Sequence, residues 1–231
     1  MKNDALPKTG FLAHASEGLI RLLDSLAVEV ELKEGEVLFE QGDVGDSLFA
    51  IISGTLEFSV LSREGRKLSL DVMRPGALFG EIALFDPGTR TATVTALEPS
   101  RVRGVKNPDV LRAIRETPEL GIDMIQLAGE RLRWMSSQLN EQVFLPMPAR
   151  LARKILYLTV DPSEALSTLK LSQAELAEFV GATREAVSKT LSVWKRANVI
   201  ESTRGGLHVL DRDAALVRPG PQRPAAGGAV R

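Results

Sequence analysis

The sequence contains no cysteine and only two histidines, His14 and His208. Without cysteine, the chain cannot form a disulfide, an iron–sulfur cluster, a thiolate zinc site or a nucleophilic thiol. Two histidines so far apart in the sequence do not favour a histidine-rich metal site either. We therefore expect neither a bound metal ion nor a resident cofactor.

Long apolar runs are also missing. Near the N-terminus, the apolar residues at 11 and 12 are soon followed by His14, Ser16 and Glu17, so neither a signal peptide nor a membrane span is indicated. At 231 residues, with 44% hydrophobic and 26% charged residues, the chain has enough apolar content for one large core or two modest ones. The sequence predicts a folded, cytoplasmic protein.

The net charge of −1 hides an uneven distribution. Residues 1–144 contain 16 basic and 22 acidic residues, which gives a net charge of −6. Residues 145–231 contain 13 basic and 8 acidic residues, which gives +5. A basic C-terminal half favours a polyanionic partner, while ordinary variation in surface charge is the alternative.

Residues 30–105 are predicted to form a mostly β domain. Short segments with apolar alternation, at 37–39, 48–52, 56–60 and 68–72, are separated by turn signals at Gly35, Gly42, Gly45, Gly54, Gly65 and Pro75-Gly76. This spacing is typical of a small antiparallel barrel or jelly roll. With the helices that follow it, the chain is predicted to belong to the α+β class.

The pattern changes to helix after Pro118. Residues at heptad spacing define a seam in which Ile125, Leu132 and Leu139 hold one position and Ala128, Met135 and Gln142 hold the other. About three heptads of this kind favour a two-helix dimer seam, and hence a homodimer. A single helix packed on its own barrel is the alternative.

Two prolines mark the boundary between the halves. Pro146 and Pro148 push the residues before them away from helical geometry, so residues 145–148 are predicted to be a hinge. We expect a β-barrel with an N-terminal helix at 1–107, a dimerisation helix at 108–144, a second domain at 149–217 and a disordered tail at 218–231. In the second domain, a helix is expected at 149–159 and a short strand at 169–171.

The second domain carries the signals of a winged helix-turn-helix. Ser172 and Glu175 form a capping box that opens a helix with apolar residues at 176, 179 and 180. Gly181 supplies a tight turn, and Thr183 can cap a second helix with an apolar stripe at 187, 191 and 194. Segments 199–202 and 207–210, on either side of residues 204–206, predict the β-hairpin of the wing.

The outer face of the second helix suits DNA recognition. It carries Thr183, Arg184, Glu185, Ser188 and Lys189. Arginine and lysine can bind guanine, glutamate can accept from cytosine, and the N-terminal part of a recognition helix meets base edges in the major groove. A merely solvated face is the alternative, but the hairpin that follows favours double-stranded DNA as the partner.

The most specific stretch of the N-terminal half is 80–85, Gly-Glu-Ile-Ala-Leu-Phe, followed by Arg90 and Thr91. Glycine lets the backbone approach an anion, and a short helical turn can point N–H groups at a phosphate. Arg90 can neutralise that phosphate, Glu81 can accept from a ribose hydroxyl, and the Thr91 hydroxyl can serve phosphate or base. A structural salt bridge between Glu81 and Arg90 is the alternative.

Both motifs resemble one known family. Residues 80–85 with 90–92 look like the phosphate-binding cassette of cyclic-nucleotide-binding domains. Residues 182–187 with Lys189 resemble the recognition helix of the cyclic AMP receptor protein and oxygen-sensor (Crp/Fnr) superfamily of bacterial transcription regulators. The order of barrel, long helix and winged helix is also that of the family, over residues 29–211. The resemblance implies an allosteric regulator with RNA polymerase as a further partner.

By position, the resemblance implies a set of ligand contacts: Gly80, Glu81, Ile82 and Ala83 for phosphate and ribose, Arg90 and Thr91 for the cyclic phosphate, and Met135 and Ser136 for the base. The last pair stands where the cyclic AMP receptor has Thr-Ser, and the Arg-Thr pair also resembles cyclic-GMP-binding modules. These departures bring cyclic GMP into consideration as the second choice of effector, while cyclic AMP remains the first. A regulator that responds to another ligand or to none is the alternative.

An enzyme that processes cyclic nucleotides is a third class. The predicted pocket offers no catalytic histidine, metal cluster or nucleophile–base pair, so we expect no enzyme.

On the DNA side, Arg184, Glu185 and Lys189 occupy the positions of three base-reading residues, the third of which is arginine in the cyclic AMP receptor. The resemblance implies a palindrome of TGTGA-like half-sites about 34 Å apart. Loops such as 161–166 are expected to contact the polymerase.

Overall fold

The computed structural model describes residues 6–159, 169, 171–203 and 206–212. The chain divides into two compact units, Met1–Ser137 and Gln138–Arg231, and each is described by itself. Three predicted features lie outside the described residues: the tail at 218–231, the polymerase-contact loop at 161–166, and the wing-turn residues Arg204 and Gly205.

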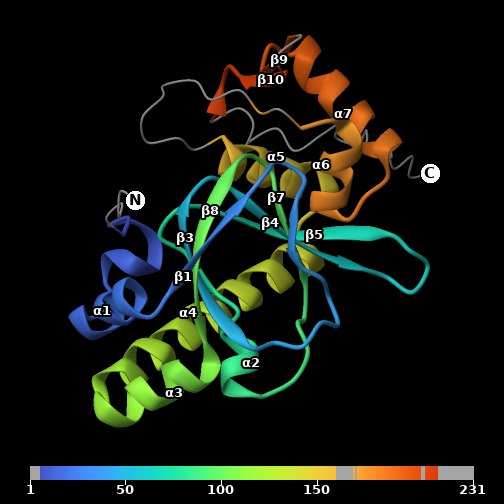
Figure 1. Cartoon of the computed structure of the whole chain (residues 1–231). Coiled ribbons are helices and arrows are strands. Elements are labelled where there is room, and N and C mark those ends of the chain that lie inside the picture. Colours follow the sequence, from blue (N-terminus) through green and yellow to red (C-terminus); the bar gives the residue numbers. More distant parts are fainter. Residues whose placement is uncertain (1–5, 160–168, 170, 204–205, 213–231) are drawn as a thin grey trace, which may run out of the picture. The chain divides into compact units, whose positions relative to one another are not determined.

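The first unit is built around two four-stranded antiparallel sheets that enclose an apolar core (Figure 1). One sheet has the order β1-β8-β3-β6 and the other the order β2-β7-β4-β5. The strands are β1 (Val28–Leu32), β2 (Val37–Phe39), β3 (Ser47–Ser53), β4 (Leu56–Leu61), β5 (Lys67–Met73), β6 (Leu78–Phe79), β7 (Thr93–Ala96) and β8 (Ser100–Lys106). The four segments predicted from apolar alternation, 37–39, 48–52, 56–60 and 68–72, lie within β2, β3, β4 and β5.

Strand β3 shows how the alternation produces two cores. Phe49 and Ile51 point into the core between the sheets, whereas Leu48, Ala50 and Ile52 pack on the helices that cover the other face. Successive side chains of a strand point to opposite faces, so a strand covered on both sides reads as a continuous apolar run. Strand β3 therefore separates the sheet interior from the helical layer.

The helical segments described in the first unit are η1 (Gly10–Ala13), α1 (Glu17–Ser25), α2 (Ile82–Phe85), α3 (Asn107–Glu116) and most of α4 (Glu119–Phe144), whose residues 138–144 belong to the second unit. The expected single helix over 108–144 is in fact two, because α3 ends at Glu116 and α4 begins at Glu119. Pro118 explains the break, since the residue before a proline avoids the helical region. No helix of the described chain is long and apolar enough to cross a membrane.

The two faces of α4 have different surroundings. Leu120, Met124 and Leu127 are buried against the apolar cluster that includes the outer side of β3. The heptad residues Ile125, Leu132 and Leu139 are 73%, 65% and 64% exposed. These three residues are therefore exposed in the described chain, while other residues of α4 are buried, and the dimer seam stays a prediction.

The second unit contains α5 (Met147–Leu158), α6 (Gln173–Val180), α7 (Arg184–Arg196), β9 (Ile200–Thr203) and β10 (Gly206–Val209). Their apolar faces meet in one core around Trp194, which is 1% exposed. Helix α5 begins two residues earlier than expected, because the first turn of a helix needs no N–H from Pro148. The expected strand at 169–171 is a single bridge between Leu169 and Leu207. With the β-rich first unit, this arrangement confirms the α+β class.

The start of α6 and the turn after it follow the sequence signals. The Ser172 side chain accepts from the N–H of Glu175, and the Glu175 carboxylate accepts from the N–H of Ser172 at 2.7 Å. Gly181 then adopts a left-handed conformation, with φ of 60°, which glycine reaches without steric cost. Both features fix where α6 begins and ends, and so where α7 begins.

We expect Ser172→Ala to lower the free energy of unfolding by about 1 kcal/mol, because loss of an N-cap hydroxyl typically costs about 0.5 to 2 kcal/mol. Urea denaturation followed by Trp194 fluorescence, in a background in which the other tryptophan is replaced by Trp134→Phe, measures the change. Ser192→Ala is the matched control, since Ser192 lies on the exposed face of α7 and alanine is the better helix former. An equal loss in both variants would contradict the capping role of Ser172.

Candidate functional site

Three of the predicted ligand residues come together where β6 ends. Gly80 follows β6 with φ of +86°, and Glu81 precedes α2. Arg90 Nη2 donates to the carbonyl of Ser47 at 2.9 Å, and Arg90 Nη1 donates to the carbonyl of Gly80 at 3.4 Å. A Cβ at position 80 would lie 2.8 Å from both Arg90 Nη1 and the Ser47 oxygen, so only glycine fits here.

The Arg90 guanidinium is buried but remains charged. The residue is 6% exposed, and burial lowers its pKa, which the negative charges of Asp46, Asp43 and Glu81 partly offset. Arginine nevertheless keeps its proton in proteins, because its pKa lies far above neutral pH. Among the described residues, two of its five N–H donors have hydrogen-bond acceptors, and the other three do not.

Glu81 pairs with a residue that sequence reasoning missed. Its carboxylate lies 3.4 Å from Nε of Arg131 on α4, and Arg131 Nη2 donates to the carbonyl of Leu78 at 2.9 Å. The alternative interpretation of the motif was a salt bridge between Glu81 and Arg90. The ion pair described for Glu81 is instead with Arg131. No local pattern marks Arg131, because it comes from a helix 50 residues further along the chain.

The other predicted ligand residues are less closely grouped. Ile82 and Thr91 are exposed, and Ala83 is buried in α2. Met135 and Ser136 lie on α4 about one turn after Arg131, with exposed side chains. In the part of the chain that the structure describes, these two residues lie outside the hydrogen-bonded group of Gly80, Ser47 and Arg90.

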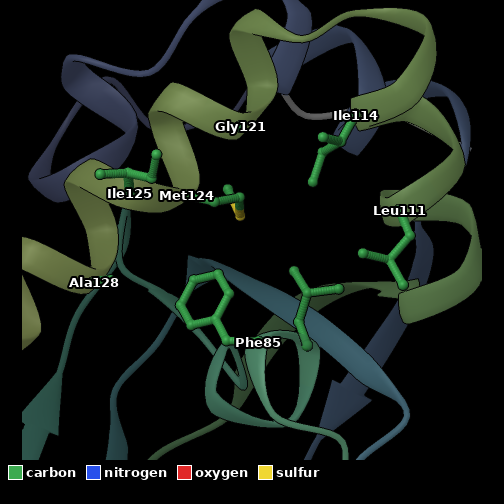
Figure 2. Close-up of a pocket in the computed structure, with 8 residues that line it drawn as sticks. Phe85, Leu111, Ile114, Gly121, Met124, Ile125 and Ala128 are labelled. Carbon is green, nitrogen blue, oxygen red and sulfur yellow. The ribbon is translucent and has the colours of Figure 1, made fainter.

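An apolar pocket lies beside this site (Figure 2). It has a volume of about 440 Å³ and is lined by Leu84 and Phe85 of α2, Leu111 and Ile114 of α3, and Gly121, Met124, Ile125 and Ala128 of α4. Figure 2 shows Phe85, Ile114 and Leu111 pointing into this space. Because Ile125 and Ala128 are also seam positions, the apolar wall of α2 is continuous with the exposed stripe of α4.

The outer face of α7 carries the predicted DNA-reading residues. Thr183 caps the helix by accepting from the N–H of Ala186 at 3.2 Å. Arg184, Glu185 and Lys189 are exposed and Ser188 is half-buried, whereas the opposite face is buried. Hydrogen bonds from its own backbone N–H and from Thr183 lower the pKa of Glu185, so its carboxylate is ionised and can only accept.

The described residues contain no group of three or more histidine, aspartate or glutamate side chains placed to hold a metal ion. Two of the described arginines of the first unit are buried, Arg90 and Arg103. Arg103 is paired with Asp24 and Glu29, whereas the Arg90 guanidinium lies beside a glycine. Such an arrangement can bind an anion but offers no nucleophile–base pair for chemistry on it.

Comparison with known proteins identifies the two units. A family model described as a cyclic nucleotide-binding domain matches residues 29–117, and one described as a Crp-like helix-turn-helix domain matches residues 149–214. A protein of Mycobacterium tuberculosis, named CRP-like cAMP-activated global transcriptional regulator, is 32% identical over 197 residues, covering 82% of this chain and 87% of that protein. This chain belongs to the Crp/Fnr family of transcription regulators.

Other Crp/Fnr proteins are similar over most of their length. The cyclic AMP receptor protein of Thermus thermophilus is 31% identical over 185 residues, covering 80% of this chain and 83% of that protein. The solved structure of a CRP/FNR-family regulator from the same organism matches with a TM-score of 0.71 and 27% identity, covering 84% of this chain and all of that one. The family predicted from the two motifs is confirmed: the protein is a DNA-binding regulator with a cyclic nucleotide-binding domain, and not an enzyme.

Proposed function

We propose that this Crp/Fnr regulator is switched by a cyclic nucleotide, with cyclic AMP as the first choice and cyclic GMP as the second. The observation that carries the proposal is the buried, charged guanidinium of Arg90, which has free N–H donors and lies against a glycine that no other residue can replace. Two relatives more than 30% identical are named for cyclic AMP, which supports the first choice.

In this proposal, the backbone and side chains at 80–83 bind the phosphate and ribose. Arg90 forms charge-assisted hydrogen bonds to the cyclic phosphate, and the exposed Thr91 hydroxyl binds phosphate or base. Met135 and Ser136 face the base from α4. Methionine offers no hydroxyl to a base, so the contrast between adenine and guanine rests on Ser136 and Thr91.

Calorimetric titration of the purified chain with cyclic AMP and cyclic GMP tests the effector. Saturable binding of one nucleotide, at least about ten times tighter than the other, would identify it. If neither nucleotide binds, the proposal is wrong, and the protein responds to another ligand or to none.

We further propose that the chain acts as a homodimer joined along α4. The exposed heptad residues Ile125, Leu132 and Leu139 form an apolar stripe, and the half-buried Ala128 and exposed Met135 lie between them. Stripes of this kind are unusual on monomers and mark surfaces that bind a partner. The seam would bring two recognition helices to one palindrome.

The geometry also suggests how ligand and DNA are coupled. The Glu81 carboxylate that would accept from the ribose hydroxyl is held by Arg131 of α4, the helix that also carries the seam. A ligand that changes this ion pair acts directly on the dimer helix, and such couplings are typically worth about 1 to 3 kcal/mol. Pro146 and Pro148 would shape the hinge beyond α4.

For DNA, we propose a palindrome of TGTGA-like half-sites, read from α7 in the major groove. Arg184 and Lys189 can donate to guanine and Glu185 can accept from cytosine, while Thr183 and Ser188 complete the contact face. RNA polymerase is the further partner that the family implies. A regulator acts where its DNA lies, so we place the protein in the cytoplasm.

Arg184→Ala is expected to weaken binding to the palindrome about 5- to 150-fold and to relax the preference at one base pair, because a bidentate base contact is worth about 1 to 3 kcal/mol. Fluorescence anisotropy with the palindrome and with single-base variants measures both effects. Lys195→Ala is the matched control, since it removes a charge three turns further along α7. If Lys195→Ala relaxes the same base preference, Arg184 does not read that base.

A further inference from the structure

We propose that Phe39 is a positioning residue for Arg90, whose guanidinium it holds where a cyclic phosphate would meet it. The inference rests on the cyclic-nucleotide function proposed above. Arg90 Cζ lies 4.2 Å from the centroid of the Phe39 ring and 5.5 Å from that of Phe49. Both distances fall within the range of about 6 Å at which a cation is attracted to an aromatic face.

The Phe39 ring is itself held by neighbouring rings in the core between the sheets. Its centroid lies 5.9 Å from that of Phe49 and 6.2 Å from that of Phe79, and these two rings stack on each other at 5.4 Å. Gly104 makes room for the group, because a Cβ there would lie 2.7 Å from Cε1 of Phe49. The ring under Arg90 therefore has little freedom to move.

The turn that follows Phe39 fixes the main chain of Arg90 as well. The N–H of Arg90 donates to the carbonyl of Asp43 at 2.7 Å, and the N–H of Gly42 donates to the carbonyl of Arg90 at 2.9 Å. Asp43 is held in turn, since its carboxylate accepts from the N–H of Glu40 at 2.8 Å. The short segment 39–43 thus holds both the backbone and the side chain of Arg90.

Ring contact is suited to a residue that must still bind an anion. The N–H donors of a guanidinium lie in its plane, whereas a ring packs against its flat face, so the contact uses none of the donors. It also fixes a long side chain before the ligand arrives, which reduces the conformational entropy lost on binding. A leucine at position 39 would fill much of the same space without attracting the cation.

Calorimetry of the full chain with cyclic AMP and cyclic GMP tests the role of the ring. Phe39→Leu is expected to raise the Kd of the bound nucleotide about 5- to 10-fold, within the range of a desolvated cation–π contact, and Phe39→Tyr to restore it to within about twofold of wild type. Phe11→Leu is the matched control, because Phe11 is also half-buried but packs on the helical side of the barrel. It should leave the Kd unchanged.

A second measurement does not depend on the ligand. The Nε–H resonance of Arg90 in nitrogen-15 spectra, assigned by its loss in Arg90→Lys, should show a ring-current shift in wild type and in Phe11→Leu. This shift should be lost in Phe39→Leu. This shift tests whether the ring lies over the guanidinium, and the Kd tests whether that contact positions Arg90 for the ligand.

The outcomes separate the two proposals. If wild type binds neither nucleotide, the proposed effector is wrong and the role of Phe39 falls with it. If wild type binds but Phe39→Leu keeps the same Kd, only the inference about Phe39 is overturned, whatever the Nε–H shift. Should Phe39→Leu fail to fold, Phe39→Met, which is flexible and also lacks a ring, is judged by the same two measurements.

Discussion

Replacement of Arg90 by alanine is expected to weaken cyclic-nucleotide binding about 100-fold or more. Charge-assisted hydrogen bonds contribute about 1.5 to 3 kcal/mol each, and two of them to one phosphate would account for a loss of this size. Ligand-dependent DNA binding should be lost with them. Calorimetry for the nucleotide and anisotropy for the palindrome measure the two effects.

The control must separate ligand binding from stability, since Arg90 also bonds the carbonyls of Ser47 and Gly80. Arg115→Ala removes an exposed arginine from α3 and should leave nucleotide affinity unchanged. Arg90→Lys keeps the charge but not the planar fork, so its affinity should lie between those of wild type and Arg90→Ala. Nucleotide affinity at the wild-type level in a folded Arg90→Ala variant would refute the assigned role.

The second large effect is expected from Leu132→Asp on the exposed face of α4. In a homodimer joined along α4, Leu132 would be buried in both protomers, and each buried leucine contributes about 1.5 to 3 kcal/mol. The dimer dissociation constant should therefore rise about 1000-fold or more, because each 1.4 kcal/mol is about a factor of ten and a buried carboxylate adds a further cost. Analytical ultracentrifugation over a concentration series measures the change.

Gln126→Asp is the matched control, because it places the same charge on an exposed position of α4 outside the heptad stripe. It should leave the dimer intact. If Leu132→Asp sediments as wild type does, α4 is not the seam, and the exposed stripe must bind something other than a second copy.

Local signals were enough to predict most of the framework. The capping box at Ser172, the glycine turn at Gly181 and the alternation in the strands act over two to four residues, so their outcome does not depend on the rest of the chain. The ligand motif was also legible, because Gly80, Glu81 and Arg90 are close together in the sequence. Their nearness in the sequence made the motif visible, and the ligand role assigned to it rests on the family resemblance.

What could not be predicted depends on residues far apart in the chain. Arg131 reaches Glu81 from α4, where the sequence predicted a seam and base contacts but no partner for Glu81, and Phe39 reaches Arg90 from β2. Neither has a local signal, because an arginine on a helix or a phenylalanine in a strand is ordinary in itself. The break between α3 and α4 has a local signal in Pro118. The expected helix over 108–144 nevertheless ran through this proline, because only Pro146 and Pro148 were interpreted as a boundary.

Strand β3 carries one further consequence, which concerns the alignment of strands during folding. When both faces of a strand are apolar, a shift of the pairing register by one residue replaces one apolar face by the other. Hydrophobic patterning alone then does not disfavour the wrong register. Here Phe49 lies directly opposite Gly104 on β8, and no Cβ is tolerated under its ring. After a one-residue slip, Phe49 would face Arg103 or Val105, both of which have a Cβ. A single missing side chain thus encodes the correct pairing of the two central strands.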